Sequence, residues 1–116
     1  MPSAPEILFH IDEPIRWDNP VPLILARGWC FARGGVPVTH IRAITDDGAW
    51  DGVHGLPRPD VAAAFDHAPG SAESGWTLRI PRPETIPGRI VFEVWLENEQ
   101  SIAIREVTVT APHPSS

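Results

Sequence analysis

Three acidic residues lie close together in one short segment near the middle of the chain. Asp46, Asp47 and Asp51 surround Gly48 in the sequence TDDGAWDG. Several carboxylates in one loop can hold a hard cation such as calcium, but the later bidentate glutamate of an EF-hand loop does not follow here. An Asp-Gly pair is also a common hairpin turn, which accounts for the same residues more simply. The sequence therefore favours a turn over a calcium site.

Histidine and cysteine are the other residues that could carry metal or nucleophilic chemistry. The histidines are scattered over the chain: His10, His40, His54, His67 and His113. They form neither a His-x-His nor a His-x-x-x-His pair. The single cysteine, Cys30, excludes an intrachain disulfide and lies in an apolar stretch, as a buried small residue does. With no G-x-S-x-G motif and no recognisable carboxylate pair, we expect no catalytic activity, no cofactor and no structural metal.

A weak binding site is the remaining chemical hypothesis, and five residues are its candidates. Trp50 lies beside the polar residues Asp51 and His54, and an exposed tryptophan can stack on a sugar ring or anchor a protein interface. Arg58 and Asp60 flank a proline and could fix a ligand hydroxyl or carboxylate. The simpler interpretation, which we favour, is that Arg58 ties the loop to a carbonyl or an acidic neighbour and Asp60 caps a short helix.

The tryptophans bear on what such a site would bind. Trp76 alternates with aliphatic residues and is expected in the core, and Trp29 in the core or under the helical segment that follows. Trp95 alternates with glutamates and is expected on an outer face. For Trp17, Trp50 and Trp95, contact with sugar and contact with protein both stay open. A concave site with polar neighbours favours sugar, and a flat apolar sheet face favours protein.

Short elements must position these residues, because 14 prolines and 9 glycines divide the chain. In Arg89–Glu97 apolar residues occupy every second position, as in a half-buried strand. The last apolar stretch changes parity, which predicts a β-bulge near Arg105 and Glu106. The seven expected strands are Glu6–Asp12, Leu23–Ala32, Val38–Thr45, Ala49–Val53, Gly75–Ile80, Arg89–Glu97 and Ser101–Thr110.

One segment, Arg58–Phe65, is expected to be helical. Pro59 suits a first helical position, Asp60 suits the positive end of the helix dipole, and Val61 shares a face with the phenylalanine at position 65. We therefore expect an all-β, immunoglobulin-like antiparallel β-sandwich of about seven strands with one short helical insertion at its end. It would span residues 1–110, and the Pro/Ser-rich residues 111–116 would form a tail or linker.

The expected core and the overall charge complete this description. Trp76, Phe92, Val94 and Ile104 should be nearly fully buried in one cluster. The formal net charge of -6 argues against binding to nucleic acid or to an anionic membrane surface. The chain contains no lysine, which excludes Schiff-base chemistry and a P-loop lysine. No leader pattern or long apolar stretch is visible, so we expect a soluble cytoplasmic protein.

Three short sequences carry a resemblance to a known family. They are GWCF at 28–31, RPDVAAAF at 58–65 and SGW at 74–76. Together they resemble a small immunoglobulin-like module of bacterial multidomain proteins, whose pattern is roughly G-W-x-[FL], R-x-D-V-x-x-x-[FY] and S-G-[FW]. The resemblance extends over residues 23–97. It implies an accessory module that accompanies glycosyltransferase or methyltransferase domains, many of them concerned with surface polysaccharide.

The function expected from the sequence is therefore that of a non-catalytic accessory or binding module associated with bacterial glycan-assembly enzymes. Its partner would be a glycan, bound weakly, or a neighbouring catalytic domain. The alternative is a structural domain for protein–protein interaction, or a homodimer formed through a sheet face.

Overall fold

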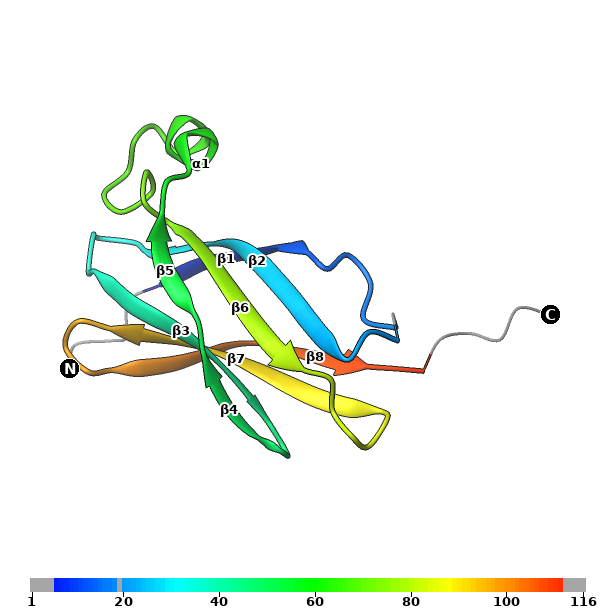
Figure 1. The fold of residues 1–116 in the computed structure, drawn as a ribbon. Helices are drawn as coiled ribbons and strands as arrows, with labels where there is room; N and C mark the ends of the chain where they lie inside the picture. Colours follow the sequence, from blue (N-terminus) through cyan, green and yellow to red (C-terminus); the bar gives the residue numbers. More distant parts are fainter. Residues whose placement is uncertain (1–5, 19, 112–116) are drawn as a thin grey trace.

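The computed structural model describes residues 6–18 and 20–111 of the chain (Figure 1). Alternating polarity produces strands, and the many prolines and glycines keep them short. The strands are β1 (Ile7–Glu13), β2 (Leu23–Ala32), β3 (Val38–Thr45), β4 (Gly48–Asp51), β5 (Val53–Leu56), β6 (Gly75–Pro81), β7 (Gly88–Leu96) and β8 (Ser101–Val109). One helix, α1 (Pro59–Ala64), lies between β5 and β6.

The strands form two antiparallel sheets packed face to face. One sheet has the order β1-β2-β6-β5 and the other the order β4-β3-β7-β8. In immunoglobulin notation these are the strands A-B-E-D and C′-C-F-G, which is the immunoglobulin arrangement with one additional edge strand. The expected all-β, immunoglobulin-like sandwich with a short helical insertion is confirmed.

The segment expected as one strand, Ala49–Val53, is divided between the two sheets. β4 pairs with β3 in one sheet and β5 pairs with β6 in the other, and only Gly52 connects them. The Gly52 amide donates to the Ile41 carbonyl at 2.7 Å. A Cβ atom at Gly52 would lie 2.3 Å from the Thr77 carbonyl oxygen, so only glycine fits where the chain crosses. This crossing adds the eighth strand.

The core lies between the sheets and follows the expected alternation. Trp76, Phe92 and Val94 are fully buried in one cluster, as predicted. Ile104 is only half-buried, because it is the extra residue of a β-bulge on the edge strand β8. The bulge itself was expected one residue later. It turns Ile102, Ile104 and the valines that follow toward the core despite their change of parity.

The helix stands at one end of the sandwich, as expected. Figure 1 shows α1 and its flanking loops at the end where β7 turns into β8, whereas the β1–β2 connection and the end of β8 lie at the opposite end. Of the expected tail at 111–116, only Ala111 belongs to the described residues. Among the described residues, no helix is long and apolar enough to cross a membrane.

Candidate functional site

Arg58 fastens the helical insertion to the body of the sandwich. Its guanidinium donates to both carboxylate oxygens of Asp60, at 3.0 and 2.8 Å. It also donates to the Asp12 carboxylate on β1 at 2.7 Å and to the Gly28 carbonyl on β2 at 3.3 Å. One side chain therefore links the start of α1 to two strands of the sheet below it. This is the structural role that we favoured for Arg58.

The charges of this cluster stabilise one another. Hydrogen bonds from Arg58 lower the pKa of Asp60 to about 2, and the pKa of Arg58 is raised for the same reason. Asp60 is the second residue of the helix, and the N-cap residue Arg58 makes no side-chain cap hydrogen bond. Asp60 pairs with Arg58 and also has hydrogen bonds to the backbone of Val61 and of Asp60 itself, which lower its pKa further, and its charge lies at the positive end of the helix.

The apolar side of the insertion covers part of the outer face of the β1-β2-β6-β5 sheet. The Phe65 ring lies edge-on to Trp29 at 5.4 Å and to Phe31 at 5.3 Å between ring centroids. Val61 is buried. Trp29 is thus covered by the segment RPDVAAAF, one of the two positions expected for it. We call this part of the face the covered half.

The remaining residues of the resemblance also have structural roles. A Cβ atom at Gly28 would lie 1.9 Å from the His10 carbonyl oxygen, so β1 can approach β2 here only because position 28 is glycine. The buried Ser74 hydroxyl donates to the Ser71 carbonyl at 2.7 Å, and the Ser74 carbonyl accepts from the Cys30 amide at 2.8 Å. Gly28 and Ser74 therefore have structural roles at this end of the sandwich and do not identify a ligand.

His54 points between the sheets from β5. Its Nε2 lies 2.7 Å from the Cys30 carbonyl oxygen and must donate to it, since a carbonyl can only accept. Burial lowers the pKa of His54, and its hydrogen bonds to the backbone of Cys30 and Val38 oppose this only in part. His54 also lines a hollow of about 300 Å³ with Gly55 and Glu73. Its polar atoms are engaged by the backbone instead of facing a ligand.

Asp51 lies on the outer face of the other sheet. It accepts from Arg42 Nε at 2.6 Å, and this hydrogen bond lowers the pKa of the carboxyl. Arg42 also lies 4.9 Å above the ring of Trp95, which stacks on His40 at 5.5 Å. Trp95 is on the outer face, as expected, but its ring is already in contact with side chains of its own sheet.

The five residues proposed from the sequence do not converge. Trp50 is half-buried and opposite Ala43 at the edge of one sheet, while Asp51 faces outward next to it. His54 points inward from the other sheet, and Arg58 and Asp60 pair with each other at the start of α1. Their closeness in sequence does not bring them together, because the chain crosses between sheets at Gly52.

The outer face of the β1-β2-β6-β5 sheet has a second part that the described residues leave exposed. Leu23, Leu25 and Val53 are exposed there by 41%, 62% and 58%. A shallow groove of about 500 Å³ runs over this part, lined by Leu25, Val53 and charged residues of both signs, which are Arg27, Asp51 and Arg79. We call it the open half. The sequence carried one signal of it, since the start of β2 reads LILA and is apolar at both parities.

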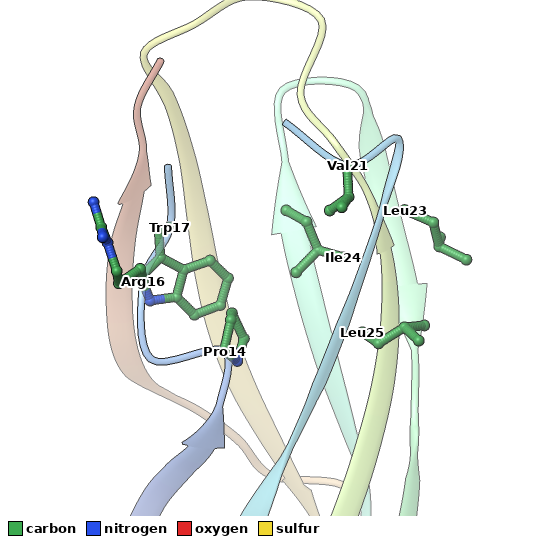
Figure 2. A pocket seen from close by; sticks show the side chains of 7 residues that line it. All are labelled: Pro14, Arg16, Trp17, Val21, Leu23, Ile24 and Leu25. Atoms are coloured by element: carbon green, nitrogen blue, oxygen red, sulfur yellow. The ribbon is translucent and has the colours of Figure 1, made fainter. Parts of the chain in front are cut away.

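A cavity of about 220 Å³ adjoins the open half at the edge of β2. Figure 2 shows Trp17 and Pro14 on one side of it and Ile24 and Val21 on the other. The side chains of Leu23 and Leu25 extend from the opposite side of β2. Trp17 also contacts the core, with its ring edge-on to Phe92 at 6.0 Å. Of the three tryptophans left open, Trp17 is thus the one that lines a cavity, and that cavity is mainly apolar.

The described residues hold little that could do covalent chemistry. Burial raises the pKa of the Cys30 thiol to about 12, so it stays protonated near neutral pH. Within residues 6–18 and 20–111, no three histidine, cysteine or acidic side chains are grouped closely enough to hold a metal ion.

Comparison with known proteins gives no further identification. No protein-family model, no curated protein and no solved structure matches this chain.

Proposed function

We propose that this chain is a non-catalytic binding module that docks a partner protein through the open half of its β1-β2-β6-β5 sheet. One observation carries the proposal. Three large aliphatic side chains, Leu23, Leu25 and Val53, lie exposed together on a sheet face whose other part is covered by the chain's own insertion. Exposed aliphatic side chains set among polar ones, here Arg27, Thr77 and Arg79, are typical of an interface.

The resemblance noted in the sequence adds a suggestion about the partner. If the chain is an accessory module of glycan-assembly enzymes, the open half would contact a neighbouring catalytic domain. Carbohydrate recognition has less geometric support, because Trp50, Asp51 and His54 face different surfaces and the Trp95 ring is occupied by His40 and Arg42.

Site-specific cross-linking tests this docking role. A photoreactive amino acid replaces Leu25 in cells that produce the chain, and in a second sample it replaces the exposed Thr108 on β8. We expect one discrete protein adduct from position 25, its loss when Val53→Glu is added, and no such adduct from position 108. Equal labelling from both positions would contradict the proposal.

Calorimetry with bacterial polysaccharide fragments tests the competing function. Binding that disappears with Trp50→Ala would assign the module to carbohydrate, and binding that survives this substitution would remove Trp50 from the site. The docking proposal expects no glycan binding that depends on Trp50.

A further inference from the structure

We infer that the cavity beside Trp17 binds a small neutral molecule made of one ring and one carboxamide-like group. The site is separate from the docking surface of the open half, and the inference does not depend on the proposed function. Four features of the cavity support it: apolar walls from both sheets, backbone groups of a strand edge, a neutral rim and a small volume.

Apolar side chains from both sheets form the walls of the cavity. They are Trp17 and Pro14 on one side and Val21 and Ile24 on the other (Figure 2). Trp17 is held to the β4-β3-β7-β8 sheet, because its carbonyl accepts from the Thr110 amide at 3.1 Å. Ile24 belongs to β2 of the other sheet and is buried in the core. A ligand between them would contact both sheets, in a space that is already formed.

The strand β2 has an unpaired edge next to this cavity. β1 pairs with β2 only from Ala32 back to Arg27. Among the described residues, no strand lies beside Leu23–Ala26 on this side, although β6 continues on the other side. Leu23 and Leu25 line the cavity together with Ile24, yet their side chains extend from the opposite side of the strand. The backbone edge of β2 therefore forms part of the lining.

The hydrogen bonds of β2 show which backbone groups face this edge. The Pro22 carbonyl accepts from the Arg82 amide at 3.0 Å, so the even-numbered residues of β2 point to β6. The register between β2 and β6 is continuous from Leu23 onward, so the alternation holds along this part of the strand. The N–H and C=O groups of Leu23 and Leu25 therefore point to the unpaired edge. An apolar cavity with a few fixed polar groups is the usual form of a small-molecule site.

The rim of the cavity is electrically neutral. Among the described residues that line it, Arg16 alone is ionisable. The Arg16 guanidinium donates to the Asp18 carboxylate at 2.6 Å, so its charge is already paired. An ionic ligand would lose hydration here without gaining an unpaired opposite charge. The site therefore favours a neutral group that both donates and accepts hydrogen bonds, as a carboxamide does toward a backbone N–H and C=O.

The volume limits the ligand to about one ring. The cavity holds about 220 Å³, less than the roughly 300–1,000 Å³ of pockets for larger ligands. An apolar cavity of about 150 Å³ accommodates one benzene molecule, so the space beside Trp17 suffices for a ring and one small substituent. The indole of Trp17 offers such a ring an aromatic partner. Benzamide has this composition and serves as the probe.

The test is a nuclear magnetic resonance titration of the isotope-labelled chain with benzamide. We expect saturable shifts of the amide signals of Leu23, Ile24 and Leu25, with a dissociation constant of about 1 mM or tighter. Nuclear Overhauser contacts should join the ring protons of benzamide to the methyl groups of Val21 and Ile24. Absence of saturation, or contacts only with residues outside the cavity, would overturn the inference.

Ligands of related shape separate the features of the site. Benzoate and benzylammonium keep the ring but carry a charge, and each should bind at least about tenfold more weakly than benzamide. Toluene lacks the hydrogen-bonding group and should also bind about tenfold more weakly. Benzoate that binds as tightly as benzamide would contradict the neutral ligand class, because Arg16 would then be available to an anion. Equal binding of toluene would contradict the role of the strand edge.

Variants of the chain locate the site. Val21→Phe fills the cavity and should weaken benzamide binding at least about tenfold. The matched control Val53→Phe places the same side chain on the open half and should change binding by less than about twofold. If Val21→Phe does not fold, 2-naphthamide decides with the unchanged chain. Its second ring exceeds the space, so binding as tight as that of benzamide would contradict the assignment to this cavity.

This site and the docking surface can fail separately, although Leu25 lines both. Failure of benzamide to bind while the cross-link from position 25 persists would remove this inference and leave the proposed docking role intact. Saturable binding of benzamide by a chain that gives no discrete adduct would support the cavity site and remove the docking role.

Discussion

The two halves of the outer face of the β1-β2-β6-β5 sheet differ in whether their apolar side chains are shielded from water. In the covered half, Trp29 and Phe31 are shielded by Phe65 and Val61 of the insertion. In the open half, Leu23 and Leu25 are of similar apolar character and remain exposed. An insertion of 18 residues, 57–74, covers the first half, whereas no comparable segment of the described chain covers the second.

The difference indicates that the two halves serve different ends. Covering aromatic side chains removes apolar surface from water and so stabilises the domain itself. Leaving aliphatic side chains exposed contributes nothing to the isolated domain but stabilises a complex. If the proposed docking role holds, the covered half serves folding and the open half serves binding, and substitutions in the two should then have opposite effects on stability and on binding.

The largest effect is expected in the covered half. Phe65→Ala removes the ring that packs on Trp29 and Phe31 and should lower the free energy of unfolding by about 3 kcal/mol, somewhat less than Phe92→Ala in the core at about 3–5 kcal/mol. Urea unfolding measures both variants. A loss below about 1 kcal/mol for Phe65→Ala would mean that the insertion does not stabilise this half.

A smaller effect is expected from the residue that holds the insertion in place. Arg58→Ala removes the hydrogen bonds to Asp12 and Gly28 and should cost about 2 kcal/mol. Arg58→Lys keeps the charge but lacks the planar fork that reaches Asp60 and Asp12 together, so it should recover only a minor part. Thermal unfolding of the pair is the measurement, and full recovery by lysine would contradict the proposed geometry.

The half-buried His54 should make stability depend on pH. Because burial lowers the pKa of His54, the unfolded chain takes up a proton near the ordinary value of 6.5 while the folded chain resists it. Stability should therefore be constant above that value and fall as the pH is lowered through and below it. Denaturant midpoints across this range measure the effect, and His54→Gln should flatten the profile.

Asp60 has a separate window at lower pH. Its folded pKa of about 2 lies below the ordinary 3.8, so its contribution is lost only as the pH falls between these values. A fall in stability that begins near pH 6.5 in the His54→Gln variant would contradict the assignment to histidine.

The smallest effect on stability is expected in the open half. Leu25→Thr and Val53→Thr each place threonine, a residue that favours strands, on the sheet. Both substitutions remove apolar surface that is already in water. Each should change the free energy of unfolding by no more than about 0.5 kcal/mol. The cross-link from position 25 should nevertheless weaken when Val53→Thr is added. A loss of stability like that of Phe65→Ala would mean that the open half is part of the core.

Much of this architecture could be predicted from the sequence because it follows from local chemistry. Alternation located the strands, and Pro59 with the apolar pair Val61 and Phe65 located the helix. The crossing at Gly52 could not be predicted from the sequence pattern. Only the structure shows that a Cβ atom at this position would clash with the Thr77 carbonyl. Burial of Ile104 was overestimated, because a parity pattern does not show that β8 is an edge strand.

The candidate site was less predictable for a related reason. Residues 50–60 were grouped because they are close in sequence, but the sheet crossing and the turn into α1 place them on separate surfaces. For the open half, the sequence shows only that the start of β2, LILA, is apolar at both parities. That Leu23, Leu25 and Val53 remain exposed becomes visible only in the structure.

The connection of β4 to β5 through Gly52 has a mechanical consequence. A single residue leaves no slack, so the two sheets cannot slide past each other at that edge. At the opposite edge β1 leaves β2 after Glu13, and a cavity separates Trp17 from Ile24. The two sheets should therefore separate more readily at the β1 edge, where no described strand pairs with the first residues of β2, than at the edge that Gly52 holds together.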